Sequence, residues 1–409
     1  MATWAGTILA GADLRRALLD KAVMARASLA GAAMYESDAG GAIDLDLTGA
    51  RPHPFFEPAP GEAAGTVTFL EVPGYAVRGS RRQHLVPAPD GSVYYLERGG
   101  ALLNFTVNGF WIPVGLPPGL HGDLHWAVAD GENNLWLSTD IAIAHANLEG
   151  VSLESGTGEH VYRTLPASEV GSVLSVTAGP GAQLWVCGQG EPAGIASYLL
   201  SPRLRNGKVP DYTQATYRSP AQDAAGALPL APEVFLTLSP SAGKLFLMDP
   251  DQTQVRILTK RKGRPGQATP RAMALQGRNV WVTLPNHDRI MLIRLAEKRG
   301  QELMRAELVP IDLPEGSQPW GIALGPDGAL WFTAKGSGRI GRIDPEKGLA
   351  VETFPLPEGC RPTDIVAGAR DGRMYFLQEA TGRIGAIRAH LPARIDPEAK
   401  ANPAAVPEP

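Results

Sequence analysis

The sequence predicts an all-β fold, a seven-bladed β-propeller preceded by a short coil of five-residue repeats. One observation is that an apolar residue followed by a bulky one recurs at seven places, 35 to 61 residues apart. A second is the abundance of turn-forming residues, because 47 glycines and 36 prolines suit a chain of many short strands. Repeats of this length are typical of a β-propeller. The anchor pairs are Val93-Tyr94, Leu135-Trp136, Leu184-Trp185, Leu245-Phe246, Val280-Trp281, Leu330-Trp331 and Met374-Tyr375.

Residues 316–344 show what one long repeat contains. Gly321 to Leu324 reads as an apolar strand, and Pro326-Asp327-Gly328 as a tight turn, because proline presets φ and glycine accepts positive φ. Leu330 to Thr333 and Arg339 to Ile343 read as two further strands. A sheet this small cannot cover its own apolar faces. We therefore expect neighbouring copies to bury them in a ring, with a β-sandwich containing chance aromatics as the alternative.

The chain begins with a different repeat, of five residues, over positions 2–36. Ala12-Asp13-Leu14-Arg15-Arg16 is its clearest unit, and it resembles the pentapeptide-repeat family. That resemblance implies a square, right-handed β-helix with four units per coil. An α-helix is the alternative, because Ala, Leu, Arg and Lys favour helices, although a period of five gives no apolar helical stripe. Seven units make fewer than two coils, so we expect the coil to stack on a second copy, on the propeller or on a protein partner.

The coil is followed by a Gly-, Ala- and Pro-rich linker over residues 37–64. Thr66 to Val72 then reads as a strand that precedes the first complete repeat. The last repeat ends at Arg383 to Ile387 without a fourth strand. We therefore expect 66–72 to supply that strand and to close the ring.

The predicted domains are the coil (1–36), the linker (37–64), the propeller (65–391) and a disordered tail (392–409). Within the propeller, residues 205–231 read as a polar insertion that decorates one face. The predicted blades span 80–115, 121–165, 170–205, 232–260, 268–313, 317–356 and 361–390.

Composition excludes several classes of function. The net charge of −4 gives no reason to expect nucleic acid or an anionic membrane as a partner. No apolar run approaches the roughly 18 residues of a membrane span, and no signal peptide is evident, so we expect a cytoplasmic protein, with signal-independent export as the alternative. The two cysteines, Cys187 and Cys360, have no metal-ligand spacing. We expect neither a metal ion nor a cofactor.

The motif Pro319-Trp320-Gly321-Ile322, followed by residues 325–333 and by Arg339-Ile340-Gly341-Arg342-Ile343, resembles the virginiamycin B (streptogramin) lyase family. Residues 361–385 repeat this pattern loosely. The resemblance implies a propeller that opens a cyclic depsipeptide by elimination. The family uses a histidine base in a Glu-Pro-His-Gly motif on the last blade, a second histidine on the blade before, and glutamate ligands for a magnesium ion.

This chain departs from the family pattern at the positions that carry the chemistry. Arg361-Pro362-Thr363 stands in place of Glu-Pro-His, and Trp320 stands in place of the second histidine. Ala334 occupies a position where glutamate is common, and Glu379 alone fits a ligand position. Elimination needs a base with a near-neutral pKa and a cation, and one carboxylate does not hold magnesium. We therefore expect no catalytic residue.

Residues at the start of the innermost strands should line the channel mouth and bind a ligand or partner. His84 and His125 fall at equivalent places in adjacent blades, but a metal site would need a third ligand, and a polar rim is the alternative. Trp320 and Arg271 form a candidate binding platform, or else Trp320 simply packs. The candidate set is His84, His125, Arg271, Trp320, Thr363, Asp364 and Glu379, with Val234-Phe235 as the equivalent pair in the fourth blade.

Two classes of function remain. In the first, the protein is a non-catalytic binding or structural propeller within a larger assembly. Residues 1–36 would then bind a protein partner or a second copy, and the channel mouth would bind a small molecule or glycan. In the second, it is a lyase or hydrolase acting on a cyclic ester or depsipeptide, with a rearranged site around His125, Arg271, Asp364 and Glu379.

Overall fold

The computed structural model places most of the residues it describes in short strands. It describes residues 3–15, 17–19, 22–34, 50, 55, 62–70, 72, 83–88, 91–97, 102–107, 111–114, 124, 126–129, 134–139, 142–147, 163–166, 172–178, 183–189, 194–200, 212–218, 223–231, 234–248, 253–258, 266–297, 302–368, 371–379 and 383–389. The predicted tail over 392–409 and His125 lie outside these residues.

The five-residue repeats wind into a β-helical coil. Parallel bridges join Thr3 to Val23, Ile8 to Ser28 and Asp13 to Ala33, so equivalent positions lie four repeats apart. Apolar side chains fill the inside of the coil. No helix occurs among the described residues of this segment, and the α-helical alternative is therefore wrong. The buried set is Leu19, Ala22, Met24, Ala27, Leu29, Ala32 and Met34.

The remaining described strands form seven four-stranded antiparallel sheets. The first three sheets contain β2 (Gln83–Pro87), β3 (Val93–Glu97), β4 (Leu102–Phe105) and β5 (Trp111–Pro113); β6 (Trp126–Ala129), β7 (Asn134–Ser138), β8 (Ala142–Asn147) and β9 (Arg163–Pro166); and β10 (Ser172–Ala178), β11 (Gln183–Gln189), β12 (Gly194–Leu200) and β13 (Tyr212–Arg218).

The other four sheets have the two short 3₁₀ helices of the described chain in loops between their strands. They contain β14 (Ala225–Ala231), β15 (Val234–Ser239), β16 (Lys244–Met248) and β17 (Thr253–Ile257); β18 (Met273–Gln276), β19 (Asn279–Leu284), β20 (Arg289–Arg294) and β21 (Glu307–Asp312), with η1 (Pro285–His287); β22 (Pro319–Leu324), β23 (Leu330–Ala334), β24 (Arg339–Ile343) and β25 (Val351–Pro355), with η2 (Pro345–Lys347); and β26 (Pro362–Ala367), β27 (Arg373–Gln378) and β28 (Ile384–Arg388), completed by β1 (Val67–Leu70).

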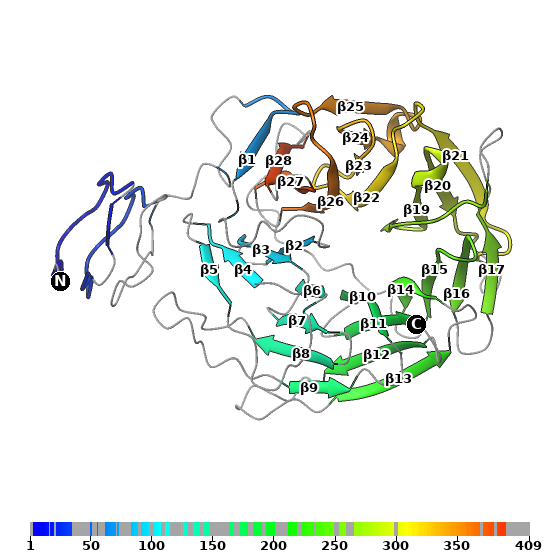
Figure 1. Ribbon diagram of the computed structural model, residues 1–409, viewed down its shortest axis with the longest axis horizontal. Coiled ribbons are helices and arrows are strands. Elements are labelled where there is room, and N and C mark those ends of the chain that lie inside the picture. The colour runs from blue at the N-terminus through cyan, green and yellow to red at the C-terminus, as the bar shows by residue number, and fades with distance from the viewer. Residues whose placement is uncertain are drawn as a thin grey trace.

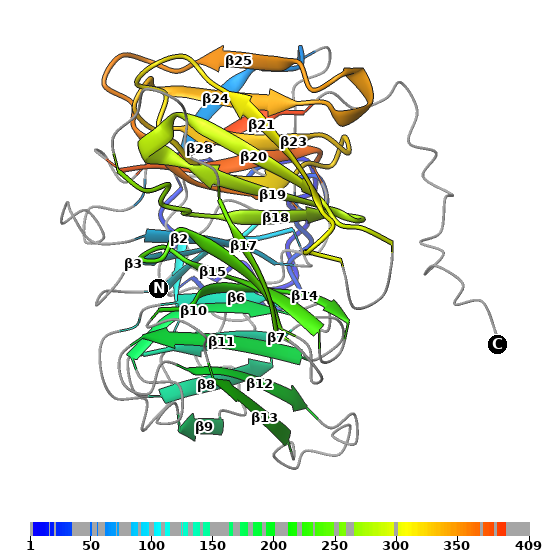
Figure 2. The same cartoon turned by 90° about the vertical axis from the view of Figure 1, so that its right-hand side faces the viewer.

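The sheets follow one another around a common centre, as Figure 1 shows face-on and Figure 2 from the side. The first strand of a sheet, such as β2, β6 or β26, lies near the centre (Figure 1). The β-propeller predicted from the sequence is confirmed, and the β-sandwich alternative is wrong.

The last sheet is completed by a strand from the beginning of the propeller, as predicted. β1 pairs antiparallel with β28, from Val67 opposite Ile387 to Leu70 opposite Ile384. The pairing covers the edge of β28 and gives the last sheet its fourth strand.

The predicted insertion at 205–231 is wrong. Tyr212–Arg218 is β13, the fourth strand of one sheet, and Ala225–Ala231 is β14, the first strand of the next. Val234-Phe235 therefore begins a second strand, β15, and does not line the channel mouth. Bulky residues follow apolar ones on both β15, at Phe235, and β16, at Phe246, so the anchor pattern fits the later strand as well as the earlier one.

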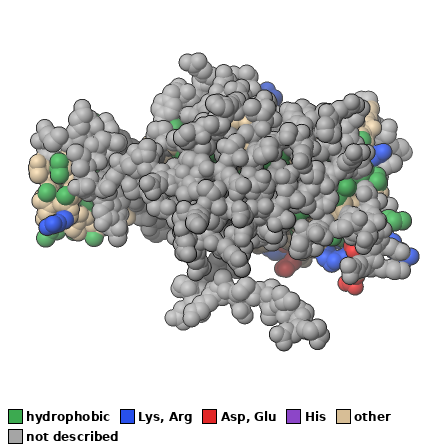
Figure 3. Space-filling model, turned by 90° about the horizontal axis from the view of Figure 1, so that it is seen from below, with side chains coloured by type: hydrophobic (Ala, Val, Ile, Leu, Met, Phe, Trp, Pro, Cys, Tyr) green, Lys and Arg blue, Asp and Glu red, His purple; other side chains and the backbone are tan. Residues whose placement is uncertain are grey.

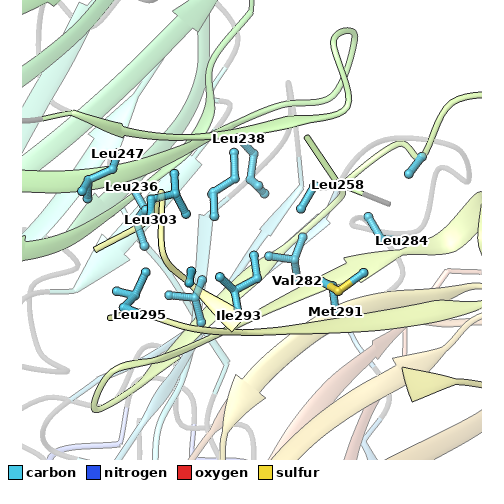
Figure 4. Close-up of a cluster of buried hydrophobic side chains, with 14 residues drawn as sticks. Leu236, Leu238, Leu247, Leu258, Val282, Leu284, Met291, Ile293, Leu295 and Leu303 are labelled. Atoms are coloured by element: carbon cyan, nitrogen blue, oxygen red, sulfur yellow. The ribbon is translucent and has the colours of Figure 1, made fainter. Parts of the chain in front are cut away.

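The hydrophobic core lies between neighbouring sheets. In Figure 4, Leu236, Leu238 and Leu247 face side chains from the next sheet along the chain, including Val282 and Ile293. The tryptophan anchors of four sheets are fully buried, and each contributes roughly 2–3 kcal/mol through removal of its apolar surface from water. Those four are Trp136, Trp185, Trp281 and Trp331.

Candidate functional site

Most of the candidate residues lie where the first strands of consecutive sheets begin. Trp320 and Thr363 are the second residues of β22 and β26, and Arg271 lies two residues before β18. Glu379 directly follows β27, and antiparallel pairing puts the end of β27 beside the start of β26, with Gln378 opposite Pro362. The register of each sheet therefore delivers side chains from two strands to the same end.

A chain of charged and aromatic contacts runs across three sheets at this end. The Lys335 Nζ atom lies 4.2 Å from the Trp320 ring centroid, and the Arg271 Cζ atom lies 4.8 Å from it. Lys335 Nζ donates a hydrogen bond of 2.8 Å to Glu379 Oε1. Glu379 Oε2 lies 3.6 Å from Arg361 Nε. We call these five residues the cationic shelf.

The cationic shelf contains two residues that sequence reasoning did not select for the site, Lys335 and Arg361. The structure brings the predicted pair Arg271 and Trp320 together, and it also adds Glu379 to the same cluster. The Lys335 side chain is only 10% exposed, so its ammonium group is stabilised by the Glu379 carboxylate and by the face of the Trp320 ring.

Threonine hydroxyls fix the backbone of the site from the neighbouring sheet. Thr283 Oγ1 donates to Trp320 O at 2.9 Å, and Thr333 Oγ1 donates to Thr363 O at 2.6 Å. Thr333 Oγ1 also accepts a hydrogen bond from Gly321 N. A Cβ atom at Gly321 would lie 2.6 Å from Thr363 O, so this close approach of two sheets requires glycine.

A second cluster joins the first and last sheets. The His84 Nδ1 atom of β2 lies 3.4 Å from Asp364 Oδ2 of β26, and the His84 ring stacks on Trp126 with centroids 3.7 Å apart. Asp364 also accepts hydrogen bonds from the backbone N–H groups of Leu85 and Ile365. Two backbone N–H groups therefore hold the Asp364 carboxylate beside the imidazole ring. The predicted neighbour His125 is not among the described residues.

The residues of the cationic shelf do not fit the magnesium ion that the family resemblance implies. Within the described part of the chain, no group of three or more His, Cys, Asp or Glu side chains lies close enough together to hold a metal ion. Glu379 is already paired with Lys335 and Arg361, whose positive charges repel a divalent cation.

The thiol nearest in sequence to the shelf is not a nucleophile at neutral pH. Cys360 precedes Arg361 and is buried. Burial raises the pKa of the Cys360 thiol to about 11, although Arg383 nearby acts in the opposite direction. The thiolate is the reactive form, so Cys360 is a structural residue at neutral pH.

Two regions of the chain match models of known protein families. Residues 276–407 match the virginiamycin B lyase family, and residues 6–43 match the family described as pentapeptide repeats (8 copies). None of the helices in the described residues is long and apolar enough to cross a membrane.

Curated relatives match over a short stretch. Virginiamycin B lyases of Bordetella bronchiseptica and Bordetella parapertussis are each 43% identical to this chain over 60 residues. The stretch is 14% of this chain and spans only 19% of the length of each relative.

Solved structures match over most of the propeller. A streptogramin B lyase structure has a TM-score of 0.60 at 14% identity, and the match covers 80% of this chain and 98% of that protein. A catalytically inactive variant of virginiamycin B lyase from Staphylococcus aureus, solved with Quinupristin, gives 0.60 at 13% identity, over 80% and 99% of the two chains. The β-propeller domain of Cps50 (Swd1) from Myceliophteria thermophila gives 0.56 at 9% identity, over 80% and 100%. Identities this low show the fold alone. The chain therefore combines a virginiamycin B lyase-like β-propeller with an N-terminal run of pentapeptide repeats.

Proposed function

We propose that this protein is a non-catalytic binding or structural propeller. The proposal rests on the residues that occupy the two positions where the resembled family has histidines, because neither of them is a histidine here. One is Trp320, an indole that only donates a hydrogen bond, in contact with two cationic side chains. The other is Thr363, whose hydroxyl is no base at neutral pH. An acid–base pair for elimination is therefore missing from both positions.

We also propose that the seven sheets are the blades of one closed ring, formed by residues 65–391. Contacts between the first strands support this, because β2, β6, β10, β14, β18, β22 and β26 each contact the next, and β26 contacts β2. Residues 1–36 would form a right-handed β-helix, and 37–64 would join the two parts.

The N-terminal coil is the proposed attachment point to a protein partner or to a second copy within a larger assembly. Its outer surface carries hydrophobic side chains, visible at the left of Figure 3. Ile8 is 81% exposed and Leu18 is 85% exposed. Large apolar side chains that face water on a rigid coil are suited to burial against another surface.

A turnover assay tests the main proposal. The full chain is incubated with cyclic depsipeptides and lactones in the presence of Mg²⁺, and ring opening is followed by mass spectrometry. We expect no ring opening above the buffer rate, while a virginiamycin B lyase assayed in parallel opens the depsipeptide. Ring opening that disappears in Glu379→Gln would show that the protein is an enzyme.

The second candidate function is a lyase or hydrolase for cyclic esters with a rearranged site. The observation that favours it is the His84–Asp364 pair, since a carboxylate 3.4 Å from an imidazole is an arrangement that orients a general base. In that case His84→Gln would abolish ring opening, and Asp364→Asn would lower kcat more than it changes KM. An equal rate in both variants and the wild type would exclude this site.

A further inference from the structure

Glu379 stands at the position that the family resemblance assigns to a metal ligand, but its partners are cations of the protein itself. Lys335 donates a 2.8 Å hydrogen bond to one carboxylate oxygen, and Arg361 lies 3.6 Å from the other. The side chains that surround this carboxylate therefore supply the positive charge that a metal ion would otherwise provide.

The two cations have more hydrogen-bonding capacity than Glu379 uses. An ammonium group has three donors, and Glu379 is the one acceptor for Lys335 among the described residues. Arg361 is 57% exposed, and its 3.6 Å separation from Glu379 is longer than a hydrogen bond. Two positive groups thus share one negative group, and Arg361 and Glu379 are both partly exposed to solvent.

We propose that Lys335 and Arg361 bind the carboxylate of an organic ligand directly, without a metal ion. Glu379 acts as an internal competitor, because its carboxylate occupies the same two cations in the ligand-free protein. Trp320 is a positioning residue, since its ring holds the Lys335 ammonium group at 4.2 Å. The inference rests on the proposed non-catalytic binding role of the propeller and specifies the ligand class. A peptide carboxyl terminus and a free organic acid share this chemistry.

Isothermal titration calorimetry of the full chain at low ionic strength and neutral pH tests the inference. The titrants are N-acetylphenylalanine, which imitates a peptide terminus, benzoate as a simple acid, the neutral N-acetylphenylalaninamide, and MgCl₂ alone. We expect binding of one or both carboxylates, no binding of the amide, and no binding of Mg²⁺. Comparison of the two carboxylates distinguishes the peptide source from the simple acid.

Three variants identify the groups involved. Arg361→Gln should weaken carboxylate binding by about tenfold, through loss of a charged partner. Lys335→Met should have a similar effect, and because Lys335 is mostly buried, its folding is checked by thermal unfolding. Glu379→Gln should strengthen binding several-fold, because it removes the internal competitor. Arg294→Gln is the matched control, since Arg294 is half exposed and pairs with Glu307 at 2.9 Å on another sheet.

Equal binding of the acid and the amide, unchanged affinity in Glu379→Gln, or Mg²⁺ binding that depends on Glu379 would each overturn this inference. Ring opening in the turnover assay would instead overturn the proposed function. The two failures are therefore distinguishable.

Discussion

Gly341 on β24 leaves room for the Phe332 ring of the neighbouring strand β23. The two residues are paired across the sheet, and a Cβ atom at Gly341 would lie 2.0 Å from the ring carbon Cζ. Gly385 has the same relation to Phe376 in the last sheet, with 2.1 Å to that ring. The glycine in each Arg-Ile-Gly motif is thus explained by the aromatic ring that lies over it.

Gly341→Ala should therefore destabilise the protein by about 1–3 kcal/mol, the usual cost of overpacking a tight site. The free energy of unfolding, measured by denaturant titration, checks this value. Arg339→Ala in the same strand is the control, because Arg339 is exposed and should change the stability by less than about 0.5 kcal/mol. Equal stability of Gly341→Ala and the wild type would contradict the steric explanation.

Sequence reasoning found part of the cationic shelf. Trp320, Arg271 and Glu379 were identified because they occupy aligned positions in the long repeats. Lys335 was missed because it follows a strand as an isolated lysine, without a motif. Only the register, which pairs Ala334 with Pro319, shows that it reaches the same end of the sheet as Trp320.

At the level of elements, two described residues of the segment before β1, Phe55 and Glu62, contact the propeller, although the sequence predicts a linker there. Phe55 is 3% exposed, stacks on Tyr375 with centroids 5.3 Å apart, and meets the edge of Phe105 at 6.0 Å. The backbone carbonyl of Phe55 accepts a hydrogen bond from Arg373, which also pairs with Glu62 at 2.7 Å. These contacts join the segment to both the first and the last sheets.

Phe55→Ala should cost about 3–5 kcal/mol, because it leaves a cavity between Tyr375 and Phe105. Denaturant unfolding measures this cost. Phe55→Leu retains most of the buried volume and should lose clearly less stability. If Phe55→Ala unfolds like the wild type, the contacts of this residue do not stabilise the seam.

The elements with strong patterns were predictable from the sequence, and those with weak patterns were not. β1 was identified because the last repeat lacked a strand, and its pairing with β28 is confirmed. β13 was read as part of an insertion, because a polar outer strand has no apolar pattern to distinguish it from a loop. Phe55 was missed because one aromatic residue in a Pro- and Gly-rich stretch gives no periodic signal.

The whole molecule consists of a propeller and a small coil. In the described part of the coil, Ile8 and Leu18 are large hydrophobic residues exposed to solvent. If the coil binds a second copy, Ile8→Lys and Leu18→Lys together should lower the sedimentation coefficient to that of a single chain. If the coil binds a different protein, both forms should sediment as monomers, and only the wild type should retain the partner in pull-downs from the native host. Asp13→Lys on the same coil is the control, because it changes an exposed charge without removing an apolar group.

Either of these two outcomes would support the proposed role of the coil as an attachment point. A wild-type monomer that retains no more protein than the double variant would contradict it. Circular dichroism of the variants shows whether the β-rich fold persists.

The pairing of β1 with β28 has a consequence for synthesis on the ribosome. Translation produces β1 first among the propeller strands, but its partner is the last strand to emerge. Throughout that interval β1 lacks the strand it pairs with, and Phe55 lacks Tyr375 until β27 has been made. A nascent chain that stops before β28 therefore leaves an apolar strand available for wrong pairing, so completion of the last sheet is the step that commits the polypeptide to its native form.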